Sequence, residues 1–431
     1  MNRFFPIRAD RLLAHLTQIE STKLLLSHLL ACGAILYLLS GLYFLAFKNN
    51  YQLMNLKSIF TTDFSSEALP VDFKLRRVEA KYFMERLNPY DLFDAESFSK
   101  KSFPYQERLQ SLVNETGIPI TISAYPLWAF PIFVFSFTPF LNCGLSRVVF
   151  ALLNILAFIY IYKYIFRYSS TYLNRADSHL VCRSCMALNA WYITLHNGQI
   201  SALLAAAVLL SLPNSRFSYV RQTIGNIILS IKFTFGAYPL LVLFFKFKKQ
   251  VFLSAGIVCL IWIGSSLWLD ENPFAFFRQM FLMPTEGGIG LCDIFFLSYF
   301  PKSLFLLSLF ILGLSMTFCI ILRHRSDAYT KCALALILMR LFCYHQIYDN
   351  IMIFMGISIL GIRSLQSRNK IMTVIWLSCL LAFTLPSSFL NKTFMPYFYI
   401  FFLILTFVAI YAGSPSYRPS TNKLGERDSI Q

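Results

Sequence analysis

Charged residues are scarce in this sequence of 431 residues. Asp, Glu, Lys and Arg make up 14% of it, against about 25% in a typical soluble domain. Hydrophobic residues make up 57% and aromatic residues 17%. This composition excludes a soluble globule, and 45 Phe with 23 Tyr exclude a disordered chain. Apolar runs of about 20 residues recur from Leu24 almost to the C-terminus, which indicates a chain that crosses the membrane several times.

Several catalytic and binding patterns are also lacking. The sequence has no Walker-type loop, no HExxH motif, no Ser-His-Asp order and no metal-ligand spacing. We therefore expect neither a metal nor a nucleotide cofactor. Cys182 and Cys185 form a CxxC pair, but the ten Cys lie mostly in apolar runs, where a thiol behaves as a small hydrophobe. No disulfide framework is expected.

Positive charge is plentiful, and its distribution orients the chain. The net charge of +17 is dispersed between apolar runs, which is typical of cytoplasmic loops rather than of nucleic-acid binding. Residues 1–23 are basic and are expected to be a cytoplasmic segment. A transmembrane domain is expected over 24–412, and a cytoplasmic tail over 413–431.

Two large loops are expected on the extracytoplasmic side. Residues 48–122 form the first, which contains ten of the 21 acidic residues and an equal number of basic ones. Such balanced charge favours a translocated loop, and a loop of this length is usually functional. Residues 270–302 form the second, where Phe274, Phe277 and Phe281 have helical spacing.

The fold class indicated is an all-α polytopic integral membrane protein with about 11–12 transmembrane or re-entrant helices. Later spans are expected at 180–195, 251–269, 303–322, 332–342, 351–362, 371–389 and 397–412. Between 201 and 245 the apolar pieces are short and are interrupted by Pro and Gly, which favours half-helices that meet inside the membrane.

The direction of the chain between residues 123 and 180 is left open by the sequence. Two apolar runs precede the basic residues Lys163, Arg167 and Arg175. Two full crossings would place these residues outside, against the positive-inside rule. Either one run is re-entrant or the segment after Phe166 is extracytoplasmic.

The first loop contains a helical pattern directly after an acidic residue. Val71, Leu75, Val78 and Tyr82 recur at three- and four-residue spacing, which predicts an amphipathic helix on the membrane surface. The pattern ends before Asn88-Pro89, because a residue before Pro disfavours the helical conformation. Asp72 is therefore expected beside the bilayer, with a solvated carboxylate as the alternative.

Four segments resemble a known family when taken in order. They are Asp72-Phe73 with Asn88-Pro89-Tyr90-Asp91 and Tyr125-Pro126; His196-Asn197-Gly198-Gln199 before an aliphatic run; Gly225 to Leu243 with Lys232 and Tyr238-Pro239; and His345-Gln346-Ile347-Tyr348-Asp349. This order is similar to that of glycosyltransferase family 87, polyprenyl-phosphate-sugar-dependent mannosyltransferases of the GT-C fold. The resemblance spans about residues 60 to 360.

The resemblance implies a GT-C fold and transfer of a hexose, most often mannose, from a polyprenyl-phosphate donor. The acceptor would be a lipid or glycan on the extracytoplasmic face, and the membrane would be the plasma or inner membrane if the source is bacterial. Asp72 would be the general base that accepts the proton of the acceptor hydroxyl. The lipid carrier supplies the activation, so no separate cofactor is implied. The sequence indicates no oligomeric state.

The phosphate leaving group requires cations at headgroup depth, and His345, Arg340 and Lys232 are the candidates. Arg340 lies in an apolar run, where an arginine either faces a cavity or a partner or extends to the interface. Lys232 has a structural role as its alternative.

Further residues are expected to bind the substrates. They are Asn88, Tyr90, Tyr125, Asn197, Gln199, Glu286, Tyr348 and Asp349. Asn197 and Gln199 suit helix capping equally well, and Asp349 is spaced to form a local pair with His345. Glu286, next to two glycines, lines an acceptor cleft or belongs to an ordinary turn.

The alternative function is that of a transporter or flippase of a lipid-linked sugar, because half-helices and intramembrane cations suit transport as well. Transporters often contain an internal repeat with corresponding breaks in both halves. Here one broken region, 201–245, has no counterpart, and the long first loop has none either. This asymmetry favours the enzyme. A structural subunit or an inactive homologue is a third interpretation.

Overall fold

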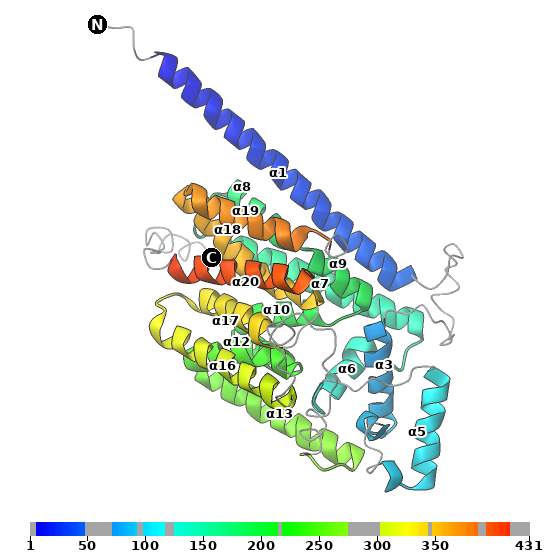
Figure 1. The fold of residues 1–431 in the computed structure, drawn as a ribbon. Coiled ribbons are helices and arrows are strands. Elements are labelled where there is room, and N and C mark those ends of the chain that lie inside the picture. Colours follow the sequence, from blue (N-terminus) through cyan, green and yellow to red (C-terminus); the bar gives the residue numbers. More distant parts are fainter. Residues whose placement is uncertain are drawn as a thin grey trace, which may run out of the picture.

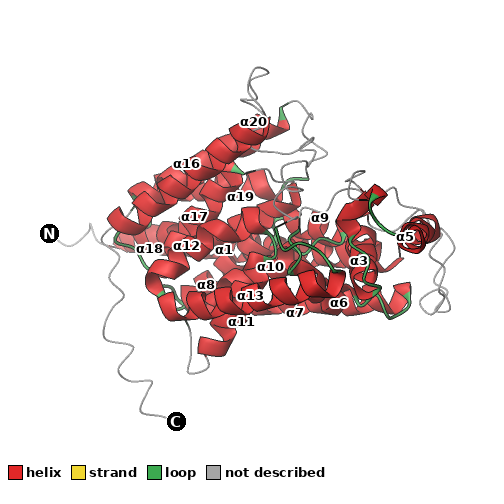
Figure 2. Cartoon of the chain, turned by 90° about the horizontal axis from the view of Figure 1, so that it is seen from below, coloured by secondary structure: helices red, strands yellow, loops and turns green. Residues whose placement is uncertain are grey.

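The computed structural model describes residues 6–47, 71–92, 98–116, 125–213, 218–274, 302–343, 347–386 and 394–413. Its elements are α1 (Pro6–Phe47), α3 (Val71–Met84), η1 (Pro89–Leu92), α5 (Phe103–Thr116), α6 (Ala129–Phe137), α7 (Cys143–Ser169), α8 (Arg175–Met186), α9 (Asn189–Asn197), α10 (Ser201–Ser211), α11 (Ser218–Ser230), α12 (Phe233–Lys246), α13 (Lys248–Leu269), α16 (Lys302–Arg323), α17 (Ala328–Phe342), η2 (Ile347–Ile353), α18 (Phe354–Ser367), α19 (Lys370–Thr384) and α20 (Met395–Ala412). Every element in these ranges is helical (Figure 2).

Within the described ranges, five stretches of helix are long and apolar enough to cross a membrane. They are Glu20–Tyr43, Cys143–Ser169, Lys248–Leu269, Asp349–Ser367 and Met395–Ala412. The pair α9 and α10 makes a sixth if it is counted as one bent span, and three shorter apolar helices lie in α12, α16 and α19. The predicted all-α polytopic membrane fold is confirmed.

The helices form a bundle with the first-loop elements at one end. Figure 1 shows α3, α5 and α6 grouped together at one end of the bundle. At the centre, α10 and α17 are buried along nearly their whole length. In contrast, α1, α13 and α20 carry exposed large apolar side chains such as Leu36, Leu260 and Phe401. Such an outward apolar surface is suited to contact with lipid.

The structure resolves the direction of the chain before α8. The nine residues of α6 extend over about 14 Å, which is too short for a hydrocarbon core of about 30 Å. The 27 residues of α7 are long enough to cross it. Lys23 Nζ pairs with Asp177 Oδ1 at 3.0 Å, and Arg183 donates to Ser27 Oγ at 2.6 Å. The start of α8 therefore lies on the same side as Lys23, and α6 is the run that does not cross.

The expected single span at 180–195 is wrong. The run is divided between α8, which ends at Met186, and α9, which begins at Asn189. Leu188 adopts an extended conformation between them, and the Trp191 indole donates to the Cys185 carbonyl across the break at 3.0 Å. An apolar composition is equally compatible with one lipid-facing helix and with two short helices packed inside a bundle. The composition of this run therefore does not predict the break between α8 and α9.

The expected first-loop helix is present as α3, but its apolar stripe does not lie on the membrane surface. Val78 and Tyr82 pack with Leu87 and with Leu109 of α5. On another side of α3, the Phe73 ring packs against the stacked pair Phe137 and Phe150, with centroids 5.6 Å and 5.5 Å away. This part of α3 is covered by protein, because Leu109 of α5 packs against Val78 and Tyr82.

Candidate active site

The turn between α9 and α10 brings two distant segments together. Gly198 ends α9 in the left-handed conformation with φ of 69°, which glycine adopts without steric cost. A Cβ atom at Gly198 would stand 3.0 Å from the Cα and N atoms of Phe73. The bend between α9 and α10 is 119°. This close approach places Gln199, which follows Gly198, beside Asp72, which precedes Phe73.

Asp72 is the second residue of α3, and its side chain is directed at this turn. The Gln199 side chain donates a hydrogen bond to its carboxylate. Arg76, Lys232 and Asp349 are near enough to influence its charge. These five residues, Asp72, Arg76, Gln199, Lys232 and Asp349, are called the polar cluster below.

Asp349 holds three helices together within the polar cluster. Its side chain is fully buried and accepts hydrogen bonds from Lys232 Nζ at 3.0 Å and 2.9 Å through its two oxygens. Ser201 Oγ, at the first residue of α10, donates to it at 2.8 Å. Asp349 lies on η2, and Lys232 directly precedes α12. The ion pair therefore connects segments that are 117 residues apart.

Burial dominates the electrostatics of Asp72. Loss of water contact raises the pKa of the Asp72 carboxyl above its ordinary value, and the nearby Asp349 carboxylate adds to this rise. The Arg76 guanidinium, the Gln199 hydrogen bond and the Lys232 ammonium oppose it. A carboxylate with a raised pKa is a stronger base than a solvated one.

Arg76 and Glu79 are two charged residues of this region that the sequence did not single out. Both are buried on α3, and the Arg76 guanidinium forms an ion pair with Glu79. The same guanidinium lies over the Tyr125 ring, 4.7 Å from its centroid. The sequence does contain a signal for these two residues. Asp72, Arg76 and Glu79 are spaced four and three residues apart, which places them on one face of a helix.

Arg340 contacts a residue next to the polar cluster. Its side chain is fully buried in α17, and its Nε atom donates to Asn350 Oδ1 at 2.9 Å, with Nη2 bound to the same oxygen. Asn350 follows Asp349 in η2, so Arg340 reaches the polar cluster through the neighbouring residue. Asn197 lies at the end of α9, where its Oδ1 atom is 3.0 Å from His196 Nδ1.

The Asn88-Pro89-Tyr90-Asp91 motif joins the first-loop helices to each other. Asn88 Oδ1 accepts from the backbone of Tyr90 at 3.0 Å. The Tyr105 hydroxyl of α5 donates to Asp91 Oδ2 at 2.7 Å, and the Tyr90 hydroxyl donates to the carbonyl of Tyr125. The structure thus places Asn88 and Tyr90 in a buried framework behind Tyr125, whose ring borders the polar cluster.

Three predicted site residues have no described side chain. His345 and Glu286 lie outside the described residues. Tyr348 lies within η2, and its backbone alone is described. Their assigned roles stay predictions.

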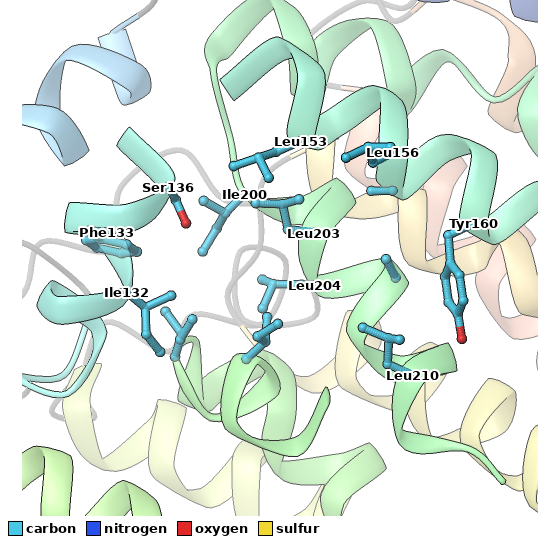
Figure 3. A pocket seen from close by; sticks show the side chains of 14 residues that line it. Ile132, Phe133, Ser136, Leu153, Leu156, Tyr160, Ile200, Leu203, Leu204 and Leu210 are labelled. Atoms are coloured by element: carbon cyan, nitrogen blue, oxygen red, sulfur yellow. The ribbon is translucent and has the colours of Figure 1, made fainter. Parts of the chain in front are cut away.

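An apolar cavity of about 300 Å³ adjoins the polar cluster. Side chains from α6, α7, α10 and α11 surround it (Figure 3). Two of its lining residues, Ile200 and Ile231, are the direct sequence neighbours of Gln199 and Lys232. Leu203 and Leu204 line it from the first turn of α10. The cavity therefore borders the backbone next to Gln199 and Lys232, and no side chain of the polar cluster lines it.

The arrangement combines a partly buried base with cations near an apolar space. Two carboxylates, Asp72 and Asp349, and two cations, Arg76 and Lys232, lie together. This combination is suited to proton removal from a hydroxyl and to stabilisation of a phosphate charge. Among the described residues, no group of three or more His, Cys, Asp or Glu is arranged to hold a metal ion.

Comparison with known proteins gives one finding. The sequence profile of glycosyltransferase family 87 matches residues 125–344, which is just over half of the chain and includes Gln199, Lys232 and Arg340. No curated protein and no solved structure matches the chain. The chain therefore belongs to glycosyltransferase family 87 and is a membrane glycosyltransferase.

Proposed function

We propose that this protein transfers a mannosyl group from a polyprenyl phosphate to a lipid or glycan acceptor, with Asp72 as the general base. The observation that carries the proposal is the adjacency of the polar cluster to the apolar cavity, through Gln199-Ile200 and Ile231-Lys232. A lipid phosphate sugar has matching parts: an apolar chain, an anion and a hydroxyl-rich head. The choice of mannose follows from the sequence resemblance.

The cavity favours a lipid donor over a nucleotide sugar. Its lining is almost entirely aliphatic and aromatic, with Ser136 and Tyr160 as the residues that carry hydroxyl groups. Burial of isoprenoid units contributes about 25 cal/mol per Å² of apolar area. A nucleotide would instead leave its polar base and ribose without partners in such a space, at a cost of several kcal/mol.

The proposed reaction is a substitution at the anomeric carbon of the donor sugar. The acceptor oxygen forms a bond to the anomeric carbon of the sugar while the bond from that carbon to the phosphate oxygen breaks. The Asp72 carboxylate takes the proton of the acceptor hydroxyl. The lipid phosphate leaves with the bonding electron pair, and Lys232, with Arg340 and His345 as further cations, stabilises its charge. Gln199 orients the carboxylate through its hydrogen bond.

We propose the extracytoplasmic face for this site. The helix α12 begins beside Lys232 and ends about 21 Å away at Lys246. The helix α18 likewise leads from Asp349 through η2 toward Arg368. Basic connections therefore lie at the end of the bundle opposite the polar cluster, and basic connections are typical of the cytoplasmic side.

The test uses the purified protein in lipid with radiolabelled polyprenyl-phosphate mannose and a panel of extracted lipid acceptors. Labelled product is expected from the wild type and not from Asp72→Asn. Polyprenyl-phosphate glucose and polyprenyl-phosphate galactose are tested in parallel to determine which sugar the protein transfers. Labelled donor that crosses liposomes without transfer would instead support a transporter, and full turnover by Asp72→Asn would remove the base assignment.

A second arm of the test examines the cavity. Ala157 of α7 lines it, so Ala157→Phe is expected to raise the KM for a long-chain donor about tenfold while changing that for a short-chain analogue little. Ala255 on α13 is exposed, and Ala255→Phe is the matched control. Equal effects of the two substitutions would argue against lipid binding in the cavity.

A further inference from the structure

Arg76 is a buried cation that the proposed reaction does not use. Its side chain has a relative exposure of 6%, although it lies on a helix of the first loop, where arginines are normally solvated. A buried guanidinium requires partners that compensate its lost hydration. The observed partners are the Glu79 carboxylate and the face of the Tyr125 ring.

The position of Arg76 relative to Asp72 is set by helix geometry. Residues four apart lie on the same face of a helix, about one turn from each other. Glu79 continues this row three residues later and Tyr125 covers it from the segment before α6, so the guanidinium is held from two sides. Its charge is the largest single influence that favours the ionised form of Asp72.

Other charged groups also face Asp72, from separate elements. Lys232 approaches from the start of α12, and Asp349 approaches from η2. These two neutralise each other in an ion pair in which both Asp349 oxygens are used. Tyr125 is a neutral phenol at ordinary pH, and burial raises its pKa further. Arg76 is paired in the same way, with Glu79, and it differs from Lys232 in lying on the same helix as Asp72, one turn away.

We propose that Arg76 is a positioning residue that keeps Asp72 ionised and ready to accept a proton, with Glu79 and Tyr125 fixing the guanidinium in place. The part of this inference that concerns proton acceptance rests on the proposed function. The part that concerns the ionisation of Asp72 is independent of it and is tested by a measurement that needs no substrate.

The test is an infrared pH titration of the protein in detergent. The carbonyl band of the protonated Asp72 carboxyl is identified by its loss in Asp72→Asn, and its midpoint is compared among variants. Arg76→Met and Arg76→Gln are expected to raise the midpoint by about one pH unit or more, the scale of an Asp beside an Arg. Arg76→Lys, which retains the charge, is expected to restore most of the wild-type value.

Two further variants calibrate the titration. Asp349→Asn removes a negative charge that faces Asp72, so it is expected to lower the midpoint. Arg77→Met is the matched control, because Arg77 is equally buried but donates to Ser146 Oγ and the Leu141 carbonyl instead. Thermal unfolding confirms that each variant is folded, and Arg76→Gln replaces Arg76→Met if the latter does not fold.

The outcomes separate this inference from the proposed function. The inference is overturned if Asp349→Asn shifts the Asp72 midpoint while Arg76→Met and Arg76→Gln leave it unchanged. It is also overturned if Arg77→Met shifts the midpoint as much as the Arg76 variants do. A raised midpoint together with no transfer by the wild type would contradict the proposed function and leave the role of Arg76 toward Asp72 supported. If the protein transfers sugar, the pKa that limits kcat/KM on the acid side of its pH profile is expected to shift in the same direction as the infrared midpoint of Asp72.

Discussion

Gly198 contacts Phe73 so closely that a Cβ atom at Gly198 would stand 3.0 Å from the Phe73 Cα and N atoms. The contact joins two segments that are 125 residues apart in sequence. It also sets the distance between Asp72 and Gln199, because each is the direct neighbour of one contacting residue. The geometry of the polar cluster therefore depends on a backbone approach that glycine alone permits.

Gly198→Ala is expected to destabilise the protein and to abolish transfer. The left-handed conformation at φ of 69° costs about 1–2 kcal/mol for a residue with a Cβ atom, and the added methyl group would overlap with Phe73. A lower melting temperature and loss of turnover are expected together. Gly264→Ala is the control, because no atom lies within 4 Å of its Cβ position. An active Gly198→Ala would show that the close approach is not required.

Lys232→Met is expected to be more harmful than the double variant Lys232→Met/Asp349→Asn. The single change leaves Asp349 as an uncompensated charge in a fully buried position, and breaking a buried pair in this way costs about 3–5 kcal/mol. The double variant removes both charges and retains the Ser201 hydrogen bond. Melting temperatures measured by thermal unfolding in detergent give the order of stability of the wild type, the single variant and the double variant.

The control for this comparison is Lys23→Met. Its ion pair with Asp177 joins a lysine side chain that is 40% exposed, and such pairs contribute at most about 1 kcal/mol. A double variant that is no more stable than Lys232→Met would indicate that the two charges act independently.

The sequence predicted the long lipid-facing helices well. Apolar runs such as 251–269 and 397–412 correspond closely to α13 and α20, because a helix surrounded by lipid must be apolar throughout its length. The run at 180–195 failed for the converse reason. Its apolar residues face other helices, so its composition carries no information about the break at Leu188.

The candidate site was predicted as four separate motifs, and the structure brings members of each together. Asp72, Gln199, Lys232 and Asp349 come from four segments and meet in one polar cluster. The sequence did not indicate which of these residues contact each other. The Lys232–Asp349 ion pair and the Gly198–Phe73 contact each join segments far apart in sequence, and no local pattern marks such contacts. Arg76 was missed because an arginine on a loop helix is normally solvated.

Asn350→Leu is expected to lower the melting temperature strongly. It removes the oxygen that accepts two hydrogen bonds from the fully buried Arg340 guanidinium. Hydrogen bonds to charged groups contribute about 1.5–3 kcal/mol each. Asn226→Leu is the matched control in α11, since its amide makes one hydrogen bond, to Ser254 at 3.3 Å. A rise in the donor KM without a loss of stability would instead indicate that Arg340 acts chiefly on the phosphate.

Asp72→Asn is expected to stabilise the protein relative to the wild type, and increasingly so as the pH rises. Burial raises the pKa of Asp72 in the folded protein above its ordinary value, so ionisation favours the unfolded state, whose pKa is about 3.9. The stability linked to this group is present in full below the unfolded pKa and is lost as the pH rises through the folded pKa.

Asparagine has no such titration, so the melting temperature of Asp72→Asn minus that of the wild type should grow as the pH rises above about 4, the pKa of the group in the unfolded state. Thermal unfolding at a series of pH values measures this difference. Arg77→Met serves for comparison, because it changes a buried charge on the same helix that donates to Ser146 Oγ and the Leu141 carbonyl, and neither of these groups titrates in this range. A difference that shrinks with rising pH would mean that Arg76 and Lys232 stabilise the carboxylate more than burial destabilises it. The expected result places Asp72 among residues whose charge is retained at a cost to stability, which is the behaviour of a base that the fold holds ready for a proton.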